Sequence, residues 1–145
     1  MREKTRVSCL YCGATNQYPL NSEGKRVVCG RCRNELPPPG EVLEPPVEIV
    51  LNLIKKAKLP LLLDFYSPTC APCHMMHTVL ENLAKRRAGE LMALKLNVDS
   101  HPQLAARLGI KAVPTFVVVT NGNERGRTTG AMSETDFSLW VASIT

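Results

Sequence analysis

The hydrophobic residues of positions 47–145 follow two alternating patterns. Some segments place apolar residues three or four positions apart, which is typical of a helix with one buried face, whereas others are short apolar runs typical of strands buried on both faces. The pattern predicts helices over 47–54, about 72–87, 100–109 and 133–144, and strands over 61–66, 91–98, 115–120 and 124–129. Because strands alternate with helices before a final hairpin and helix, we expect an α/β fold, a mixed sheet with helices on both faces.

Several element boundaries carry their own signals. Ser100 is expected to cap the short helix that ends at Gly109, and Ser133 with Asp136 forms a capping-box sequence. The dipeptide Asn121-Gly122 predicts a tight hairpin between the last two strands.

Residues 1–36 have a different composition, with few large apolar side chains and many Cys, Arg, Asn and Gly residues. A segment this short cannot bury a useful core by itself. Residues 37–46 are rich in proline and are expected to form a semi-rigid connector. The sequence therefore predicts three parts: a small domain over 1–36, a linker over 37–46 and a larger domain over 47–145.

Composition narrows the class of protein. The chain has 145 residues, of which 44% are hydrophobic and 21% charged, as in a globular protein. No apolar run approaches the ~20 residues that cross a membrane, and no secretory signal is visible, so we expect a cytoplasmic location. The net charge is +5, and its excess lies in residues 1–36; a solubilising surface is favoured there, and nucleic acid is not expected as a partner.

Four cysteines in the first part have the spacing of a metal site. Cys9 and Cys12 form one Cys-x-x-Cys pair, and Cys29 and Cys32 form a second. Two tight turns can present four thiolates to one tetrahedral ion, which favours structural zinc, a zinc ribbon with no open coordination position. Metal binding would supply the folding free energy that a core supplies elsewhere. A single iron ion and two disulfides are the alternatives.

The remaining cysteines, Cys70 and Cys73, lie where a buried strand is followed by a helix. The unpaired N–H groups of a helix start favour negative charge, so Cys70 is expected to be an exposed, easily ionised thiol and Cys73 a more buried one. Such a pair can exchange disulfides. Asp64 interrupts the apolar strand before this pair, and a buried carboxyl has a raised pKa suited to proton exchange. Lys95 similarly interrupts the next strand and is expected near Asp64 or at an edge.

Together these residues resemble a thioredoxin over positions 47–145, and the four-cysteine segment is similar to that of the zinc-containing second thioredoxins of bacteria. The motifs that carry the resemblance are Leu-Asp64-Phe, Cys70-Ala-Pro-Cys73, Lys95-Leu-Asn-Val-Asp99, Gly109-Ile-Lys-Ala-Val113-Pro114-Thr115, Asn121-Gly122 and Gly130-Ala131.

The resemblance implies a protein-disulfide reductase that acts on disulfide-containing client proteins, is recycled by a thioredoxin reductase and works as a monomer. It implies that Cys70 attacks the client, that Cys73 resolves the mixed disulfide, and that Asp64 assists Cys73 while Lys95 tunes that carboxyl. It also implies a cis proline beside the dithiol and a client-binding surface. The residues implied in that surface are Thr69, Val113, Pro114 and Gly130.

This sequence departs from the usual family pattern near the dithiol. Thr69 replaces a tryptophan, Ala71 a glycine, Tyr66 a second tryptophan and Thr78 a proline. The first strand of the fold is expected to be short or lost within residues 40–46.

Two other functions compete with this interpretation. Cys70-x-x-Cys73-His74 also spells a haem-attachment motif, which the surrounding pattern disfavours. The alternative kept is a zinc-ribbon binding module, for client protein or nucleic acid, with a secondary redox domain.

Surface positions are expected for the histidines and core positions for the methionines of this region. These residues are His74, His77, His101, Met75, Met76 and Met92.

Overall fold

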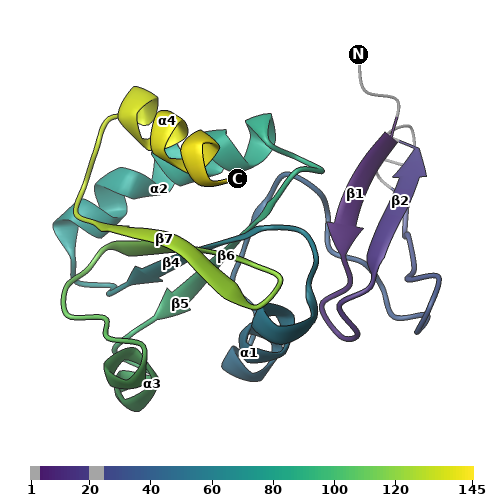
Figure 1. Ribbon diagram of the computed structural model, residues 1–145, viewed down its shortest axis with the longest axis horizontal. Coiled ribbons are helices and arrows are strands. Elements are labelled where there is room, and N and C mark those ends of the chain that lie inside the picture. Colours follow the sequence, from purple (N-terminus) through teal and green to yellow (C-terminus); the bar gives the residue numbers. More distant parts are fainter. Residues whose placement is uncertain (1–3, 20–24) are drawn as a thin grey trace.

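The computed structural model describes residues 4–19 and 25–145 as a five-stranded sheet with helices on both faces and a two-stranded ribbon beside it (Figure 1). The strands are β1 (Lys4–Ser8), β2 (Thr15–Pro19), β3 (Val42–Leu43), β4 (Leu61–Tyr66), β5 (Met92–Asn97), β6 (Thr115–Thr120) and β7 (Asn123–Thr129). The helices are α1 (Val47–Lys56), α2 (Ala71–Arg86), α3 (Pro102–Arg107) and α4 (Glu134–Ile144).

The sheet is mixed, as the alternation of elements predicts. Its strand order is β3-β5-β4-β6-β7; β4 runs parallel to β5 and antiparallel to β6. Strand β4 is therefore an internal strand, hydrogen-bonded to β5 on one side and to β6 on the other. A strand in this position that is buried on both faces has an almost wholly apolar sequence. The predicted α/β fold is confirmed.

Successive residues of β4 point into two different cores because side chains alternate across a strand. Leu61, Leu63 and Phe65 belong to the core that contains Val50 of α1, whereas Leu62 belongs to the core built with α2 and α4. In Figure 1, α1 and α3 lie on one side of the sheet and α2 and α4 on the other. Asp64 lies on the same face of β4 as Leu62, the face that α2 covers.

One element boundary differs from the sequence prediction. The N-cap residue of helix α3 is His101 rather than Ser100, because Pro102 takes the first helical position, where its missing N–H costs no hydrogen bond. The His101 side chain makes no capping hydrogen bond. The hairpin is as predicted: Asn121 and Gly122 both have positive φ, 52° and 80°. Ser133 caps α4 by accepting a hydrogen bond from the Asp136 N–H.

The prediction that Met75 is a core residue is wrong. Met76 and Met92 are buried, with 1% and 6% of their surfaces exposed, but Met75 is 69% exposed. The buried face of α2 follows Cys73, Met76 and Leu80 at helical spacing, so Met75 falls one position off that face.

The ribbon packs directly on the larger sheet domain. Val7, Cys9 and Cys29 lie in the same hydrophobic core as Leu53 of α1. The Asn52 side chain also donates a 3.1 Å hydrogen bond to the Tyr11 carbonyl. The proline-rich segment 37–46 joins the two parts and supplies β3, which pairs with β5.

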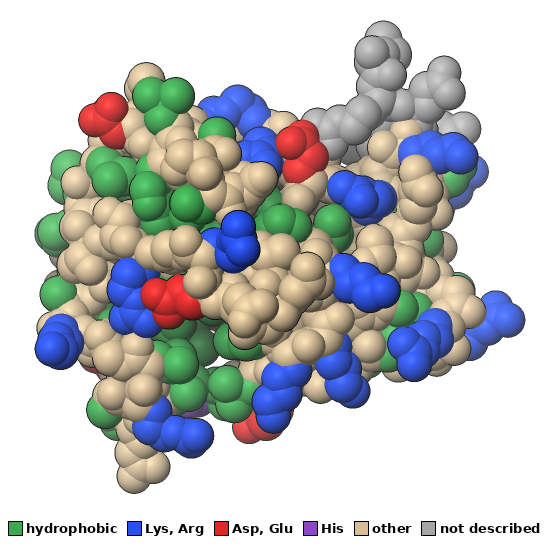
Figure 2. All heavy atoms as spheres, viewed as in Figure 1, with side chains coloured by type: hydrophobic (Ala, Val, Ile, Leu, Met, Phe, Trp, Pro, Cys, Tyr) green, Lys and Arg blue, Asp and Glu red, His purple; other side chains and the backbone are tan. Residues whose placement is uncertain are grey.

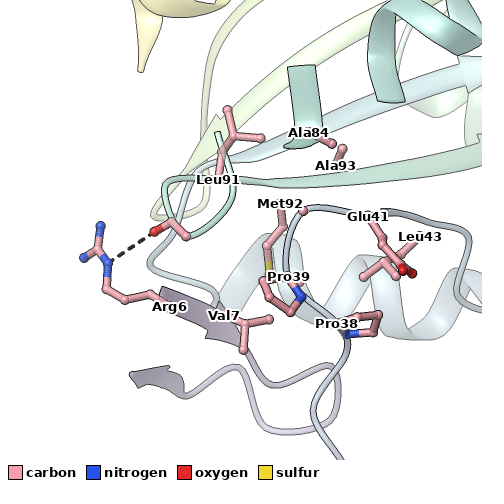
Figure 3. Close-up of a pocket in the computed structure, with 12 residues that line it drawn as sticks. Arg6, Val7, Pro38, Pro39, Glu41, Leu43, Ala84, Leu91, Met92 and Ala93 are labelled. Atoms are coloured by element: carbon pink, nitrogen blue, oxygen red, sulfur yellow. Dashed lines mark hydrogen bonds between the residues drawn. The ribbon is translucent and has the colours of Figure 1, made fainter. Parts of the chain in front are cut away.

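A narrow pocket marks the other side of this junction (Figure 3). Arg6 and Val7 of the ribbon face Leu91 and Met92 across it, and the Arg6 Nε donates a 3.3 Å hydrogen bond to the Gly89 carbonyl. The volume of this pocket is about 10 Å³, roughly enough for one water molecule, so the pocket itself has no room for a larger ligand.

The close approach of the ribbon to α1 gives a test of the packing. Gly13 has φ of +77°, and a Cβ atom there would lie 2.6 Å from the Lys56 Cβ. We expect Gly13→Ala to lower the free energy of unfolding by about 1–3 kcal/mol because it combines an unfavourable backbone conformation with this clash. Urea titration measures the loss. Gly30→Ala is the control, since an added methyl there meets no atom nearer than 3.8 Å; equal losses in both variants would contradict the docked arrangement.

On the face shown in Figure 2, basic side chains are spread over several elements. Figure 2 shows Lys and Arg side chains spread across the viewed face and around the ribbon, with apolar and polar surface between them. Arg26 of the ribbon lies 3.5 Å from Glu35. Within residues 4–19 and 25–145, no helix has the length and apolar character required to span a membrane.

Candidate active site and candidate metal centre

Cys70 and Cys73 form a disulfide at the start of α2. Cys70 is the N-cap of the helix, and its Sγ accepts a 3.2 Å hydrogen bond from the Cys73 N–H. Their Cα atoms are 5.2 Å apart, so the pair closes a ring within one helical turn. Cys73 is buried, with 6% of its surface exposed, whereas Cys70 is half-buried. A nucleophile approaching this disulfide from outside therefore meets Cys70.

The backbone before Pro114 lies against this sulfur. The Cys70 Sγ is 3.7 Å from the Val113 carbonyl oxygen, and the Val113–Pro114 peptide bond is cis, as the resemblance implies. Gly130 donates its N–H to the Pro114 carbonyl at 2.9 Å and has open space where a side chain would be. The structure thus brings Val113, Pro114 and Gly130 together around the cysteine pair.

Thr69, immediately before Cys70, is exposed and belongs to a short hydrogen-bond chain. Its hydroxyl lies 3.2 Å from the Ser67 hydroxyl, which donates a 2.6 Å hydrogen bond to the Asp99 carboxylate. Sequence reasoning gave no role to Ser67 or Asp99. In the sequence, Asp99 appears only as the last residue of the motif Lys95-Leu-Asn-Val-Asp99. Its contact with Ser67 could not be predicted, because that contact depends on how the ends of β4 and β5 meet.

His74 is on the surface, as predicted, but it also contacts the active-site loop. Its Nε2 lies 2.7 Å from the Pro68 carbonyl oxygen, so the imidazole bridges the first turn of α2 and the loop before Cys70. His77, the other histidine of α2, lies 3.5 Å from Glu81 on the outer side of the helix.

Asp64 is buried in the sheet beneath α2. Only 2% of its surface is exposed, and its Oδ1 has no hydrogen-bond partner. Burial raises its pKa from 3.8 to about 7; Lys95 opposes the shift and Glu44 adds to it. A carboxyl with this pKa can gain and lose a proton near neutral pH.

Lys95 stands directly opposite Asp64 in the pairing of β4 with β5. Its ammonium nitrogen lies 4.2 Å from the centre of the Tyr66 ring, a cation–π contact. The Tyr66 hydroxyl in turn donates a hydrogen bond to Glu44. Sequence analysis gave Glu44 no role because it lies in the proline-rich connector. Only the pairing of β3 with β5 brings it next to Tyr66.

The buried carboxyl makes stability depend on pH. Between about pH 4 and pH 7, the folded protein retains a proton at Asp64 that the unfolded chain loses, so the free energy of unfolding falls as the pH rises. We expect Asp64→Asn to remove this decrease, which amounts to at most about 4 kcal/mol at pH 8. Urea titrations of both proteins at several pH values measure the difference. Parallel pH profiles would contradict a buried, titrating Asp64.

Four cysteines gather at the other end of the molecule. Their Sγ atoms lie within 4.8 Å of one another, and two pairs, Cys9 with Cys32 and Cys12 with Cys29, are 3.5 and 3.6 Å apart. Four sulfurs at about 2.3 Å from one zinc ion would be roughly 3.8 Å apart, so these positions fit tetrahedral zinc. Cys9 and Cys29 are buried, and Cys12 and Cys32 are half-buried.

Backbone N–H groups support thiolates at this cluster. The N–H groups of Cys32 and Arg31, with the Asn16 side chain, lower the pKa of Cys29 to about 6 against the effect of burial. Burial instead raises the pKa of Cys9 to about 12. A cation at the centre would favour release of the Cys9 proton as well. Four cysteine sulfurs gathered in this way form a donor set that could hold a metal ion.

A cysteine pair that closes within one helical turn, with one sulfur accessible, can pass its disulfide to another thiol pair. On this α/β sheet the arrangement defines a dithiol–disulfide oxidoreductase.

The comparisons with known proteins give the family. Residues 49–143 match the family Thioredoxin, and the chain belongs to it. It is 29% identical over 135 residues to "Thioredoxin C-3" of Corynebacterium nephridii, a match that covers 93% of this chain and 92% of that protein. It is 32% identical over 90 residues to the thioredoxin of Haemophilus influenzae, covering 62% of this chain and 84% of that one.

A solved structure agrees. The chain resembles the crystal structure of chloroplastic thioredoxin z with a TM-score of 0.65 and 26% identity, over 72% of this chain and 94% of that chain. The protein is thus a thioredoxin-family oxidoreductase with a redox-active cysteine pair, and four further cysteines lie close enough to hold a metal ion.

Proposed function

We propose that this protein reduces disulfides of client proteins through Cys70 and Cys73. The observation that carries the proposal is the position of Cys70: its sulfur caps α2, accepts the Cys73 N–H and is the more exposed of the pair. In the reduced protein, the same N–H group and the helix start stabilise a thiolate at Cys70.

The reaction proceeds in two exchanges. The Cys70 thiolate attacks one sulfur of a client disulfide, forming a mixed disulfide and releasing the second client sulfur as a thiolate. Asp64 then accepts the proton of the Cys73 thiol, directly or through water, and the Cys73 thiolate attacks the Cys70 sulfur. The client sulfur that was bonded to Cys70 leaves as a thiolate, both client thiolates take up protons, and the two electrons gained by the client come from the cysteine pair.

Lys95 tunes the base in this scheme. Lys95 pairs with Asp64 in the β4–β5 register, and its positive charge lowers the pKa that burial raises, so the carboxyl titrates near neutrality. Asp64 is therefore a base in the resolving step and Lys95 is a residue that acts through it.

We propose that clients dock around Cys70 on Thr69, Val113, Pro114 and Gly130. The Val113 carbonyl lies beside the sulfur, and the free space over Gly130 admits an extended backbone. Thr69 is small and polar where the family usually has tryptophan, so the surface beside the nucleophile is flatter and less apolar. Recycling by a thioredoxin reductase would use the same surface.

We propose one structural zinc ion in the ribbon, held by Cys9, Cys12, Cys29 and Cys32. Bound zinc would supply folding free energy, because the described part of the ribbon buries only a few large side chains of its own. With four thiolates the coordination is complete, which leaves the redox chemistry to the other cysteine pair.

Insulin reduction tests the function. Catalytic amounts of the protein, kept reduced by dithiothreitol, are expected to accelerate insulin precipitation well above the rate with dithiothreitol alone. The same protein with Cys70 and Cys73 alkylated is the control. A rate equal to the dithiothreitol background would overturn the proposal. Replacing dithiothreitol by NADPH and thioredoxin reductase then tests the recycling partner.

A further inference from the structure

Glu44 is an exposed glutamate in the connector before α1, yet three successive contacts join it to the buried Asp64. Its carboxylate accepts the hydrogen bond of the Tyr66 hydroxyl. The Lys95 ammonium nitrogen lies 4.2 Å from the centre of the Tyr66 ring. Lys95 stands opposite Asp64 in the β4–β5 register. Sequence motifs alone assign no function to Glu44.

We propose that Glu44 is a positioning residue for the dithiol chemistry. Glu44 holds the Tyr66 hydroxyl, the Tyr66 ring fixes the position of the Lys95 ammonium group, and Lys95 in turn sets the proton affinity of Asp64. The proposal rests on the role of Asp64 as base for Cys73.

Geometry favours a fixed arrangement over a chance contact. Tyr66 and Asp64 are two positions apart on β4, so both side chains rise from the same face of the sheet. The hydroxyl anchored on Glu44 restrains the ring over which Lys95 lies. Without the anchor, the ring and the lysine stem would be free to turn toward solvent.

The charges around Asp64 determine the direction of the effect. Glu44 is negative and opposes ionisation of Asp64, whereas Lys95 favours it, in agreement with their opposite influences on the Asp64 pKa. Phe116, the opposite neighbour on β6, carries no charge. The Tyr66 hydroxyl is bonded to Glu44 itself. The further titratable side chains that line the two hollows are Glu41, His77, Glu81 and Lys85 around one and His101 around the other.

Solvent limits the size of the effect. Glu44 and Lys95 both line two open hollows, of about 350 and 420 Å³, so water reaches them from two sides. Exposed charges are strongly screened. We therefore expect Glu44 to shift the titration of Asp64 by several tenths of a pH unit.

The test follows the Asp64 carboxyl by ¹³C NMR in the oxidised protein, where Cys70 and Cys73 do not titrate. Asp64→Asn assigns the signal. We expect Tyr66→Phe to raise the titration midpoint by several tenths of a pH unit, because Lys95 is released while the Glu44 charge remains. Glu44→Gln also removes a negative charge, which by itself lowers the midpoint, so we expect it to lower the midpoint less in the wild-type protein than in the Tyr66→Phe background, where no anchor is left to lose. Glu41→Gln is the matched control, since it removes a charge from the same hollow without touching Tyr66 and should shift the midpoint equally in both backgrounds.

Three results would overturn the proposal: no rise of the midpoint in Tyr66→Phe, an equal effect of Glu44→Gln in both backgrounds, or an effect of Glu41→Gln that depends on the background. Stopped-flow measurement of the resolving step gives a second readout. The acid limb of its pH profile should move to higher pH in Tyr66→Phe together with the NMR midpoint, whereas merely structural damage would lower the rate at every pH.

The base and the positioning role fail separately. If Asp64→Asn resolves mixed disulfides at the wild-type rate, the assigned base is wrong, whatever Glu44 does. If Asp64→Asn is slow but the Tyr66→Phe profile and midpoint are unchanged, the base is right and the positioning role is wrong.

Discussion

Replacing Cys70 by serine is expected to reduce insulin reduction to the dithiothreitol background, whereas Cys73→Ser is expected to accumulate a covalent complex with the client. The difference follows from position: Cys70 is the accessible sulfur at the helix start, and Cys73 is buried behind it. Without Cys70 no thiolate can attack the client; without Cys73 the mixed disulfide forms but has no partner to resolve it. Non-reducing gel electrophoresis with mass spectrometry identifies the trapped species.

Circular dichroism and metal content should be unchanged in both variants, because neither cysteine belongs to the four-cysteine cluster. Catalysis that persists in Cys70→Ser would contradict the assigned nucleophile, whereas a covalent complex formed through Cys73 in that variant would show that the two roles are reversed.

Removing a ligand of the metal cluster is expected to unfold the ribbon while the sheet domain keeps its fold. Wild-type protein should contain about one zinc ion per chain, and Cys29→Ser should lose it. The ribbon core would then separate from α1, leaving Leu53 and Val50 partly uncovered, so the melting temperature of residues 47–145 should fall as well. Metal analysis and amide hydrogen exchange across α1 measure the two effects.

Cys70→Ser is the matched control for this experiment, since it removes one thiol from the chain without touching the cluster. Full zinc content in Cys29→Ser would rule out the proposed ligand set. Loss of zinc without any loss of protection in the ribbon would instead show that the ion does not hold the fold.

Sequence alone predicted the parts of the fold whose physical cause is local. The run 61–66 is apolar because both faces of β4 are covered by a hydrophobic core, and Asn121-Gly122 adopts the positive φ values that its tight turn requires. The cysteine spacings also predicted both clusters, because a Cys-x-x-Cys turn brings its two sulfurs together whatever surrounds it.

What the sequence missed depends on contacts between distant segments. The docking of the ribbon on α1 joins residues such as Cys9 and Leu53 that share no periodic pattern. The Tyr66–Glu44 contact needs β3 to pair with β5, and β3 has only two residues. The exposure of Met75 depends on which side of α2 faces the sheet, a choice that two adjacent methionines left open.

The central claim, that Cys70 is the ionised and accessible nucleophile of a dithiol pair, is tested most directly by alkylation of the fully reduced protein with iodoacetamide across pH, read at each cysteine by mass spectrometry. We expect Cys70 to react fastest of all six cysteines at neutral pH, with a midpoint well below the ~8.5 of an ordinary thiol, while Cys73 stays protected. A Cys70 side chain that is inert at neutral pH, or one that reacts no faster than Cys73, would contradict the account.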